Sequence, residues 1–211
     1  MRCESDHGIF VTIRNGYRIY LAVYVDDLLV MGQREEDIAE VKYLLKNRYQ
    51  MKDLEVARRF LGMDIEYENG SIKFHLKQYL SALLERHGML DCNPVSTPMD
   101  PSVRLVPGMD GDGDRDGFAH VKEYQQIVGE LQFASLVARP DISCAVGTLS
   151  QFGTKPTSTH LAAAKRVLRY LKGTVDMGIV YSPPPGDLFR CGLGRRSGDQ
   201  KIKNWLRRDD E

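Results

Sequence analysis

The feature that most constrains this sequence is a pair of adjacent aspartates, Asp26 and Asp27, inside its longest apolar run. Apolar residues dominate Ile19 to Val25 and resume from Leu28 to Met31. Aspartate is depleted in strands, and two neighbouring carboxylates repel each other and lose hydration in an apolar sheet. We therefore expect two apolar strands hinged at this polar pair, with something positive nearby to offset its charge.

The spacing of the pair allows two interpretations. Hard divalent cations such as Mg²⁺ prefer carboxylate oxygens, and two-metal phosphoryl transfer needs acids at the mouth of a rigid sheet. The plainer interpretation is a turn that carries two solvated aspartates. Because an Asp-Asp dipeptide occurs in many proteins, spacing alone favours the plain turn.

Strand and helix patterns surround the pair. Gly8 to Arg14 and Tyr17 to Val25 are strand-like and are joined by Asn15-Gly16, the strongest short hairpin signal. Arg34 to Gln50 predicts a helix, because apolar residues recur at helical spacing and acids occupy its first turn. Two further elements are expected, namely a hairpin formed by 59–67 and 71–75 and a helix from Gln78 to His87 that Gly88 ends.

The composition then shifts. Asn93 to Gly117 holds four prolines and the run MDGDGDRDG, which predicts a linker and a domain boundary over residues 93–120. Beyond it we expect three helices and a short strand, over 123–137, 142–152, 158–172 and 178–182. The fold class is therefore α+β, an antiparallel sheet with packed helices followed by a small helical region.

Composition excludes several classes of protein. The chain has 211 residues, 42% of them hydrophobic and 27% charged, which are values of a globular protein rather than a disordered or fibrous one. Lys+Arg 29 balances Asp+Glu 29, so any nucleic-acid role must depend on where the charges lie. No apolar run approaches the ~20 residues of a membrane span, and no secretory signal opens the chain. We expect an intracellular protein, cytoplasmic or nuclear and without a membrane partner, whose four cysteines are free thiols.

The wider string around the aspartates is more specific than the pair itself. Leu21-Ala-Val-Tyr-Val-Asp-Asp-Leu-Leu-Val-Met-Gly32 resembles the YVDD catalytic hairpin of reverse transcriptases from copia-type LTR retrotransposons. Further blocks resemble other segments of that family, in family order, between residues 5 and 182. They include Arg59-Phe-Leu-Gly-Met-Asp-Ile65, Ala138-Arg-Pro-Asp-Ile142 and the stretch from Ala163 to Gly173.

The resemblance implies a fold and a site. Residues 1–92 would be part of a polymerase palm, 93–120 a linker, and 121–182 a helical thumb or connection region. Asp26 and Asp27 would be catalytic carboxylates that bind Mg²⁺ or Mn²⁺, and Tyr24 would lie near the primer terminus. Phe60, Leu61 and Gly62 resemble the primer-grip hairpin. The implied partners are an RNA or DNA template–primer and deoxynucleoside triphosphates.

The sequence also departs from the family pattern. The family's third carboxylate comes from an earlier palm strand, and the acids upstream of Tyr24, Glu4 and Asp6, do not lie in such a strand. Phosphoryl transfer depends on positioning and charge neutralisation, so we expect this chain alone to have no polymerase activity. After the strand at 178–182 the family's RNase H opening is missing. We interpret residues 183–211 as a disordered tail, consistent with translation out of frame, because they show no strand or helix period.

Four basic residues lie on the last expected helix, Lys165, Arg166, Arg169 and Lys172. One interpretation is sequence-independent contact with the phosphates of a template–primer duplex. The other is a solvated helix face opposite an apolar one. Both interpretations stay open.

The acidic run matches a calcium-binding loop pattern. Asp112, Asp114 and Asp116, followed by Glu123, have the spacing of an EF-hand loop. Prolines occupy the place of the entering helix, so we favour a flexible acidic loop.

The function that follows is a fragment of a retrotransposon RNA-directed DNA polymerase, inactive alone. A non-catalytic nucleic-acid-binding remnant is the alternative, and an unstable pseudogene product is a third hypothesis.

Overall fold

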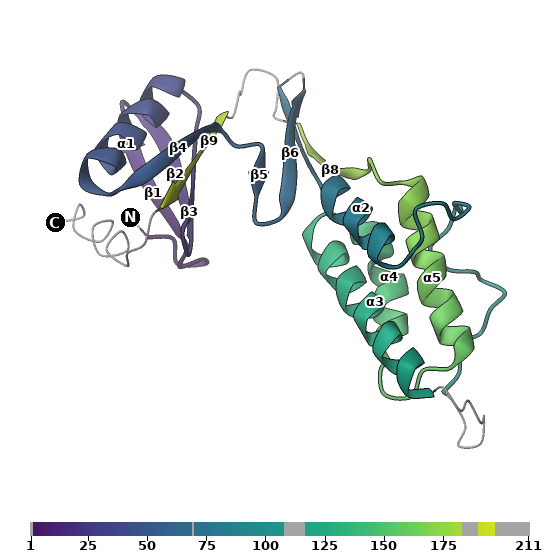
Figure 1. The fold of residues 1–211 in the computed structure, drawn as a ribbon. Coiled ribbons are helices and arrows are strands. Elements are labelled where there is room, and N and C mark those ends of the chain that lie inside the picture. The colour runs from purple at the N-terminus through teal and green to yellow at the C-terminus, as the bar shows by residue number, and fades with distance from the viewer. Residues whose placement is uncertain (1, 69, 108–116, 183–189, 197–211) are drawn as a thin grey trace. The chain divides into compact units, whose positions relative to one another are not determined.

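The computed structural model describes residues 2–68, 70–107, 117–182 and 190–196, and within 117–120 and 190–196 it describes the backbone alone. The chain divides into two compact units. We call them the sheet unit (residues 1–61, 65–72 and 181–211) and the helical unit (62–64 and 73–180). Antiparallel strands and packed helices make the fold α+β, as the sequence predicted (Figure 1).

A five-stranded antiparallel sheet forms the core of the sheet unit. Its order is β1-β2-β3-β9-β4. The bounds are Ile9–Arg14 for β1, Tyr17–Tyr24 for β2, Asp27–Gly32 for β3, Met51–Val56 for β4 and Arg190–Arg196 for β9. The predicted hairpin of β1 and β2 is confirmed, with Asn15 and Gly16 at φ of 51° and 85°. A two-residue turn of this kind needs positive φ at both positions, which Asn-Gly tolerates best.

One helix covers this sheet. Helix α1, Glu35–Arg48, confirms the predicted helix and buries Ile38, Val41 and Leu45. They pack with apolar residues of the first three strands, Phe10, Ile19, Leu21, Leu28 and Val30. Asp37, also buried, accepts a hydrogen bond from the Asn15 side chain at 2.7 Å. The turn between the first two strands is thereby tied to the helix.

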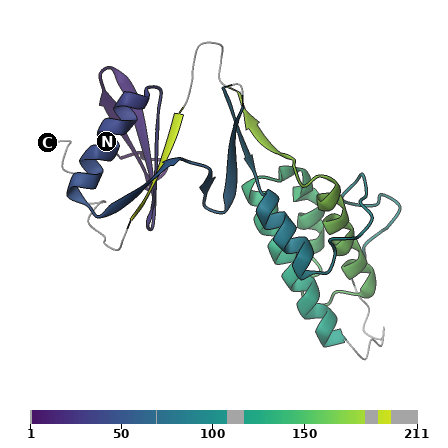
Figure 2. The same cartoon turned by 45° about the horizontal axis from the view of Figure 1, so that its top comes forward.

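The prediction of a structureless tail is wrong for residues 190–196. They form β9, which pairs with β3 on one side and with β4 on the other (Figure 2). The segment has no strand-like alternation, and β4 itself was not predicted. Pairing with two neighbours specifies β9 through its backbone, which a pattern of side chains cannot reveal. The rest of the predicted tail, 183–189 and 197–211, lies outside the described residues.

A second sheet has the order β5-β6-β7-β8, and its strands are divided between the two units. The bounds are Arg59–Phe60 for β5, Met63–Glu68 for β6, Ser71–His75 for β7 and Gly178–Tyr181 for β8. The predicted hairpin across 68–70 and the predicted strand at 178–182 are confirmed. The predicted first strand, 59–67, is split by a tight turn at Leu61 and Gly62.

Helices build the helical unit. They are α2 (Lys77–Arg86), α3 (Gly117–Val137), the short 3₁₀ helix η1 (Pro140–Ile142), α4 (Ser143–Ser150) and α5 (Ser158–Gly173). Each predicted helix is confirmed, and Gly88 follows α2 at a φ of 63°. Their buried faces share one apolar core, which includes Leu83, Tyr124, Leu131, Leu149 and Leu168. Within the described part of the chain, no helix has the length and apolarity needed to cross a membrane.

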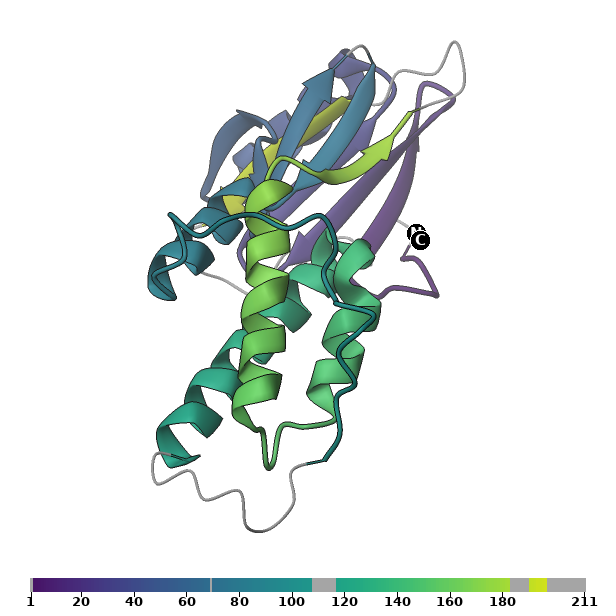
Figure 3. The same cartoon turned by 90° about the vertical axis from the view of Figure 1, so that its right-hand side faces the viewer.

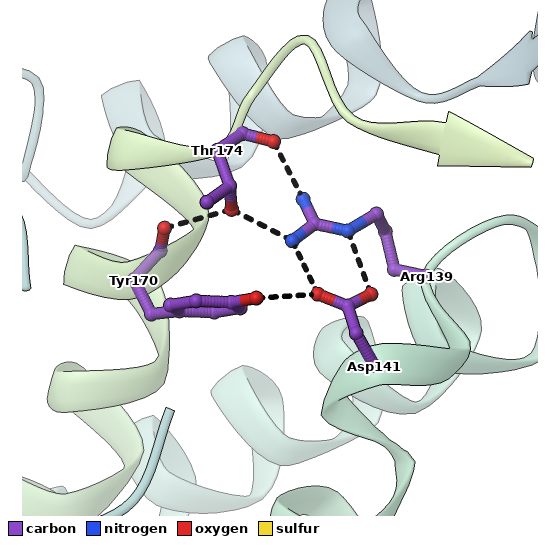
Figure 4. A network of polar contacts seen from close by, with 4 residues as sticks. All are labelled: Arg139, Asp141, Tyr170 and Thr174. Carbon is purple, nitrogen blue, oxygen red and sulfur yellow. Dashed lines mark hydrogen bonds and ion pairs between the residues drawn. The ribbon is translucent and has the colours of Figure 1, made fainter. Parts of the chain in front are cut away.

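A buried guanidinium ties the end of α3 to the end of α5 (Figure 4). Arg139 is 1% exposed and donates to both carboxylate oxygens of Asp141, at 2.9 and 2.7 Å. It also donates to the backbone oxygen and the hydroxyl of Thr174. Tyr170 donates to Asp141 at 2.9 Å. Burial alone would raise the pKa of Asp141, but the hydrogen bonds from Arg139 and Tyr170 outweigh burial and hold this pKa below its ordinary value.

The predicted boundary at 93–120 differs from the division that the structure shows, which falls between residues 61 and 73. Residues 93–105 do not form a free linker. Figure 3 shows this segment crossing the face of α5, and two basic side chains of that helix, Arg166 and Arg169, contact it. A proline-rich composition marks irregular backbone, but irregular backbone can still pack against a helix.

The central position of β9 gives a stability prediction. Replacing Leu193 with proline removes a backbone donor from a strand that pairs on both sides, and an unpaired group there costs ~1–3 kcal/mol. We expect L193P to lower the free energy of unfolding by about 2 kcal/mol or more. L193V, which keeps the N–H group, is the control. Urea denaturation measures the stability of both variants. Equal stability of the two would contradict the placement of β9 within the sheet.

His160 gives a pH prediction for the helical unit. The residue is buried in the first turn of α5, where its Nδ1 accepts a hydrogen bond from the Thr157 N–H at 2.9 Å. Burial lowers the pKa of His160 below its ordinary value. The unfolded chain therefore takes up the proton first, and stability falls as the pH drops below about 6.5. In denaturant melts, the difference in stability between wild type and H160Q should be constant above this pH and should change below it, with wild type losing more.

Candidate functional site

The aspartate pair lies at the turn between β2 and β3. Tyr24 pairs in register with Asp27, so the two turn residues are Val25 and Asp26. Asp26 is exposed, and Asp27 is half-buried as the first residue of β3. The predicted hinge at Asp26-Asp27 is thus displaced by one residue. The displacement places the two carboxylates at the tip and at the first ladder position of the same hairpin.

Val25 adopts an unusual backbone conformation at this turn. Its φ is 50°, in the left-handed region, and its side chain is 71% exposed. Glycine is the usual residue at such a turn position, because a β-branched side chain is strained there. Strain of this kind concentrates at functional sites, where the surrounding structure maintains it. Here, pairing of β2 with β3 maintains it on both sides of the turn.

The donor chemistry of the pair fits a hard divalent cation. Mg²⁺ is commonly held by one or two carboxylates together with substrate phosphates. Asp26 and Asp27 supply two adjacent carboxylates, one of them exposed. Within the residues described, no group of three or more His, Cys, Asp or Glu side chains could hold a metal ion. The pair therefore provides part of a ligand set, and a substrate or another carboxylate has to complete it.

The upstream acids have other surroundings. Asp6 accepts a hydrogen bond from the Gly8 N–H at 2.7 Å and so closes the turn that leads into β1. Gly8 in turn accepts from the Val23 N–H at 2.8 Å. Glu4 is exposed. Asp6 therefore has a structural role at the edge of the sheet.

Tyr24 ends β2 directly opposite Asp27, and its side chain is 59% exposed. An exposed aromatic ring next to a pair of carboxylates is available for a sugar or a base of a nucleic acid. Its role near a primer terminus stays a prediction.

The segment that resembles a primer grip forms a tight hairpin turn. Phe60 is buried at the end of β5, while Leu61 and Gly62 have φ of 51° and 84°. A Cβ atom on Gly62 would lie 3.5 Å from Cζ of Phe133 on α3. Phe133 packs against Tyr79, with ring centroids 4.9 Å apart. The turn is thus presented on a rigid hairpin backed by aromatic side chains, while its contact with a primer stays a prediction.

The four basic residues of α5 all contact this chain itself. Arg169 and Lys172 donate to the backbone oxygens of Asn93 and Cys92, at 2.7 and 2.8 Å. Arg166 donates to the Thr97 hydroxyl at 3.0 Å and lies 3.5 Å from Asp100. Lys165 turns the other way and pairs with Glu123 at 2.6 Å. Arg166, Arg169 and Lys172 therefore clamp residues 92–100 onto the helix, which neither interpretation of the sequence anticipated.

The calcium hypothesis is not tested by the structure. Its first three ligands, Asp112, Asp114 and Asp116, lie outside the described residues. Glu123 lies in α3 and pairs with Lys165.

The chain is similar in sequence to a known family and to several known proteins. Residues 1–101 match the family model described as reverse transcriptase (RNA-dependent DNA polymerase). The chain is 39% identical over 175 residues to the retrovirus-related Pol polyprotein from transposon RE1 of Arabidopsis thaliana. It is 40% identical over 159 residues to the Pol polyprotein from transposon TNT 1-94 of Nicotiana tabacum. It is 36% identical over 184 residues to the putative transposon Ty5-1 protein of Saccharomyces cerevisiae.

These matches cover most of the chain but little of the longer relatives. They span 83%, 74% and 85% of the chain, and 12%, 12% and 57% of the RE1, TNT 1-94 and Ty5-1 proteins. No solved structure matches the chain significantly.

Sequence reasoning missed two features of the site. The strain at Val25 has a signal in the sequence, since a two-residue hairpin loop without glycine or asparagine at its first position is unusual. The clamp on residues 92–100 has none, because side chains on a helix contact a distant segment only once the chain has folded.

The strained turn predicts an increase in stability on substitution. Val25→Gly removes strain that costs ~1–3 kcal/mol, and it loses ~0.5–1 kcal/mol through the greater entropy of the unfolded glycine chain. We expect V25G to raise the free energy of unfolding by about 1 kcal/mol. V23G, the same change inside β2, should lower it by a similar amount or more. Guanidinium denaturation tests the pair, and a loss of stability in V25G would show that the turn is unstrained.

Proposed function

The chain belongs to the reverse transcriptase family of copia-type retrotransposons, and on that premise we propose that it is a fragment of an RNA-directed DNA polymerase that is inactive alone. The hairpin of β2 and β3 would contribute two catalytic carboxylates, Asp26 and Asp27. The substrates would be deoxynucleoside triphosphates, and the partner an RNA or DNA template–primer.

The acid pair at the turn of the β2–β3 hairpin, with Asp26 exposed and Asp27 half-buried, is the observation that carries this proposal. Residues on β2 and β3 hold the turn in register, so both carboxylates are placed before any substrate arrives. Leu28 and Val30, buried under α1, anchor the strand that begins with Asp27. A divalent cation bound there would neutralise phosphate charge during nucleotidyl transfer. Tyr24 would form the edge of the site next to the primer terminus.

The relatives support this proposal, since two of them are Pol polyproteins of transposons. Because the chain spans 12% of those polyproteins, polymerase activity belongs to the complete assembly in our proposal. Inactivity of the chain alone is supported by the ligand count, since the described residues offer two clustered carboxylates and no third.

A non-catalytic nucleic-acid-binding role is the second candidate. The observation in its favour is the cluster of Arg166, Arg169 and Lys172 on one side of α5. The observation against simple phosphate binding is that each of them already contacts residues 92–100. A phosphate would have to bind the side-chain nitrogen atoms of these residues that do not take part in the contacts with residues 92–100.

A primer-extension assay tests the proposed function. The purified chain with Mg²⁺ or Mn²⁺ should extend no primer. A chimera in which residues 2–107 replace the corresponding segment of an active copia-type reverse transcriptase should incorporate nucleotides. In that chimera, D26N or D27N should reduce incorporation at least ~100-fold, because each removes charge from the metal site.

The matched control in the chimera carries Asn in place of Asp6, the same carboxylate-to-amide change at a turn where asparagine also accepts the hydrogen bond. It should incorporate at the parental rate. Full activity of the D26N and D27N chimeras would refute the catalytic assignment. Incorporation by the chain alone that D26N abolishes would refute its inactivity.

A further inference from the structure

A cavity of about 240 Å³ lies between α5 and the segment that crosses it. Met99, Val103 and Leu105 line it from the segment, and Ala163, Arg166 and Arg169 line it from the helix. It is thus an apolar pocket with two guanidinium groups at its wall.

The clamp described above forms this cavity. Arg169 holds the backbone of Asn93 through its Nε atom, and Arg166 holds the hydroxyl of Thr97. Beyond these anchors, Met99, Val103 and Leu105 border the cavity, and Met99 and Leu105 also pack against the apolar core of the helical unit. The small side chain of Ala163 on α5 leaves the volume of the cavity unfilled.

The wall of the cavity carries net positive charge. Two arginines face one carboxylate, Asp100, which also accepts hydrogen bonds from the Ser102 N–H and hydroxyl at 3.0 and 2.6 Å. Those two donors and Arg166 lie close to Asp100, and hydrogen bonds from Ser102 hold its pKa below the ordinary value. Arg169 uses only Nε in a contact with the described residues. Its two terminal nitrogens are therefore available to an anion.

We propose that this cavity binds one unstacked nucleotide of a single-stranded nucleic acid. The phosphate would lie on the terminal nitrogens of Arg169, with Arg166 adding charge, because guanidinium groups match phosphate oxygens in geometry. The base or sugar would pack against Met99, Val103 and Leu105. A concave pocket takes a base that is splayed out of a strand, whereas a duplex keeps its bases stacked and paired.

This inference rests on nucleic acid being the partner proposed above, but not on the carboxylate pair. The cavity lies wholly in the helical unit, and Asp26 and Asp27 lie in the sheet unit. Loss of catalysis and loss of cavity binding can therefore be separated by experiment.

Fluorescence anisotropy of a labelled oligo(dT) with the full-length chain tests the proposal. R169Q should weaken binding about tenfold, the loss of one charged hydrogen-bonding group at ~1.4 kcal/mol per factor of ten. A163L, which fills the cavity and leaves the charge unchanged, should also weaken binding about tenfold. Unlabelled dTMP should compete with the oligonucleotide better than inorganic phosphate does, because phosphate alone lacks the apolar part.

Each variant has a matched control. K165Q removes one positive charge from α5 outside the cavity, and A82L places the same leucine on the exposed side of α2. Both should bind within about twofold of wild type. Thermal melts of all variants report folding, and A163L keeps every clamp contact even if R169Q loosens the segment.

Several outcomes would overturn the proposal. Equal losses in R169Q and K165Q would show diffuse attraction to the charged helix rather than a site. Wild-type affinity in A163L would show that the cavity is not occupied. Tighter binding of a duplex than of oligo(dT), or stronger competition by an acidic peptide than by dTMP, would assign the surface to another ligand. If D26N abolishes incorporation in the chimera while oligo(dT) does not bind the cavity, only this inference fails.

Discussion

Pairing on both edges of β3 is the constraint on which the candidate site depends. This strand buries Leu28, Leu29 and Val30, so its backbone N–H and C=O groups have no water to bind and need partners on each side. The second strand, β2, satisfies one edge and β9 the other. Because Asp27 opens β3, the same ladder that satisfies the backbone also places the carboxylate. A sheet with β3 at its edge would leave the turn free to shift.

A second constraint governs the helical unit. A guanidinium buried as deeply as Arg139 is tolerated only when its donors are satisfied, since removing one partner of a buried pair costs ~3–5 kcal/mol. Asp141 and Thr174 take its hydrogen bonds, and Tyr170 completes the network. These partners come from two distant parts of the chain, which fixes the end of α5 against η1. The clamp on residues 92–100 and the cavity beside it both depend on the position of α5.

The two units use charge in different ways. In the helical unit, Arg169 and Lys172 of α5 donate hydrogen bonds to backbone oxygens of the chain itself. The contact of Arg169 uses Nε, and we propose its terminal nitrogens as the ligand-binding atoms. In the sheet unit, Asp26 is exposed beside a strained Val25. A plain solvated turn has no need of strain at a β-branched residue. The strain therefore favours the functional interpretation of the pair over the plain turn that its spacing alone suggested.

The sequence by itself determined the local elements and the presence of a hairpin at the aspartate pair. Asn15-Gly16 specified a turn through its tolerance of positive φ, the periodic apolar residues of α1 and α5 specified helices, and the motif around Asp26 identified the family. Only the tertiary structure decided that β9 completes the sheet, that Val25 rather than Asp27 occupies the turn, and that residues 93–105 pack on α5. The physical reason is that the first and third results depend on contacts between distant segments: backbone hydrogen bonds of β9 with β3 and β4, and basic side chains that donate to carbonyl oxygens about 80 residues away. The second result depends on the exact register of β2 with β3. Such contacts leave no periodic trace in the sequence.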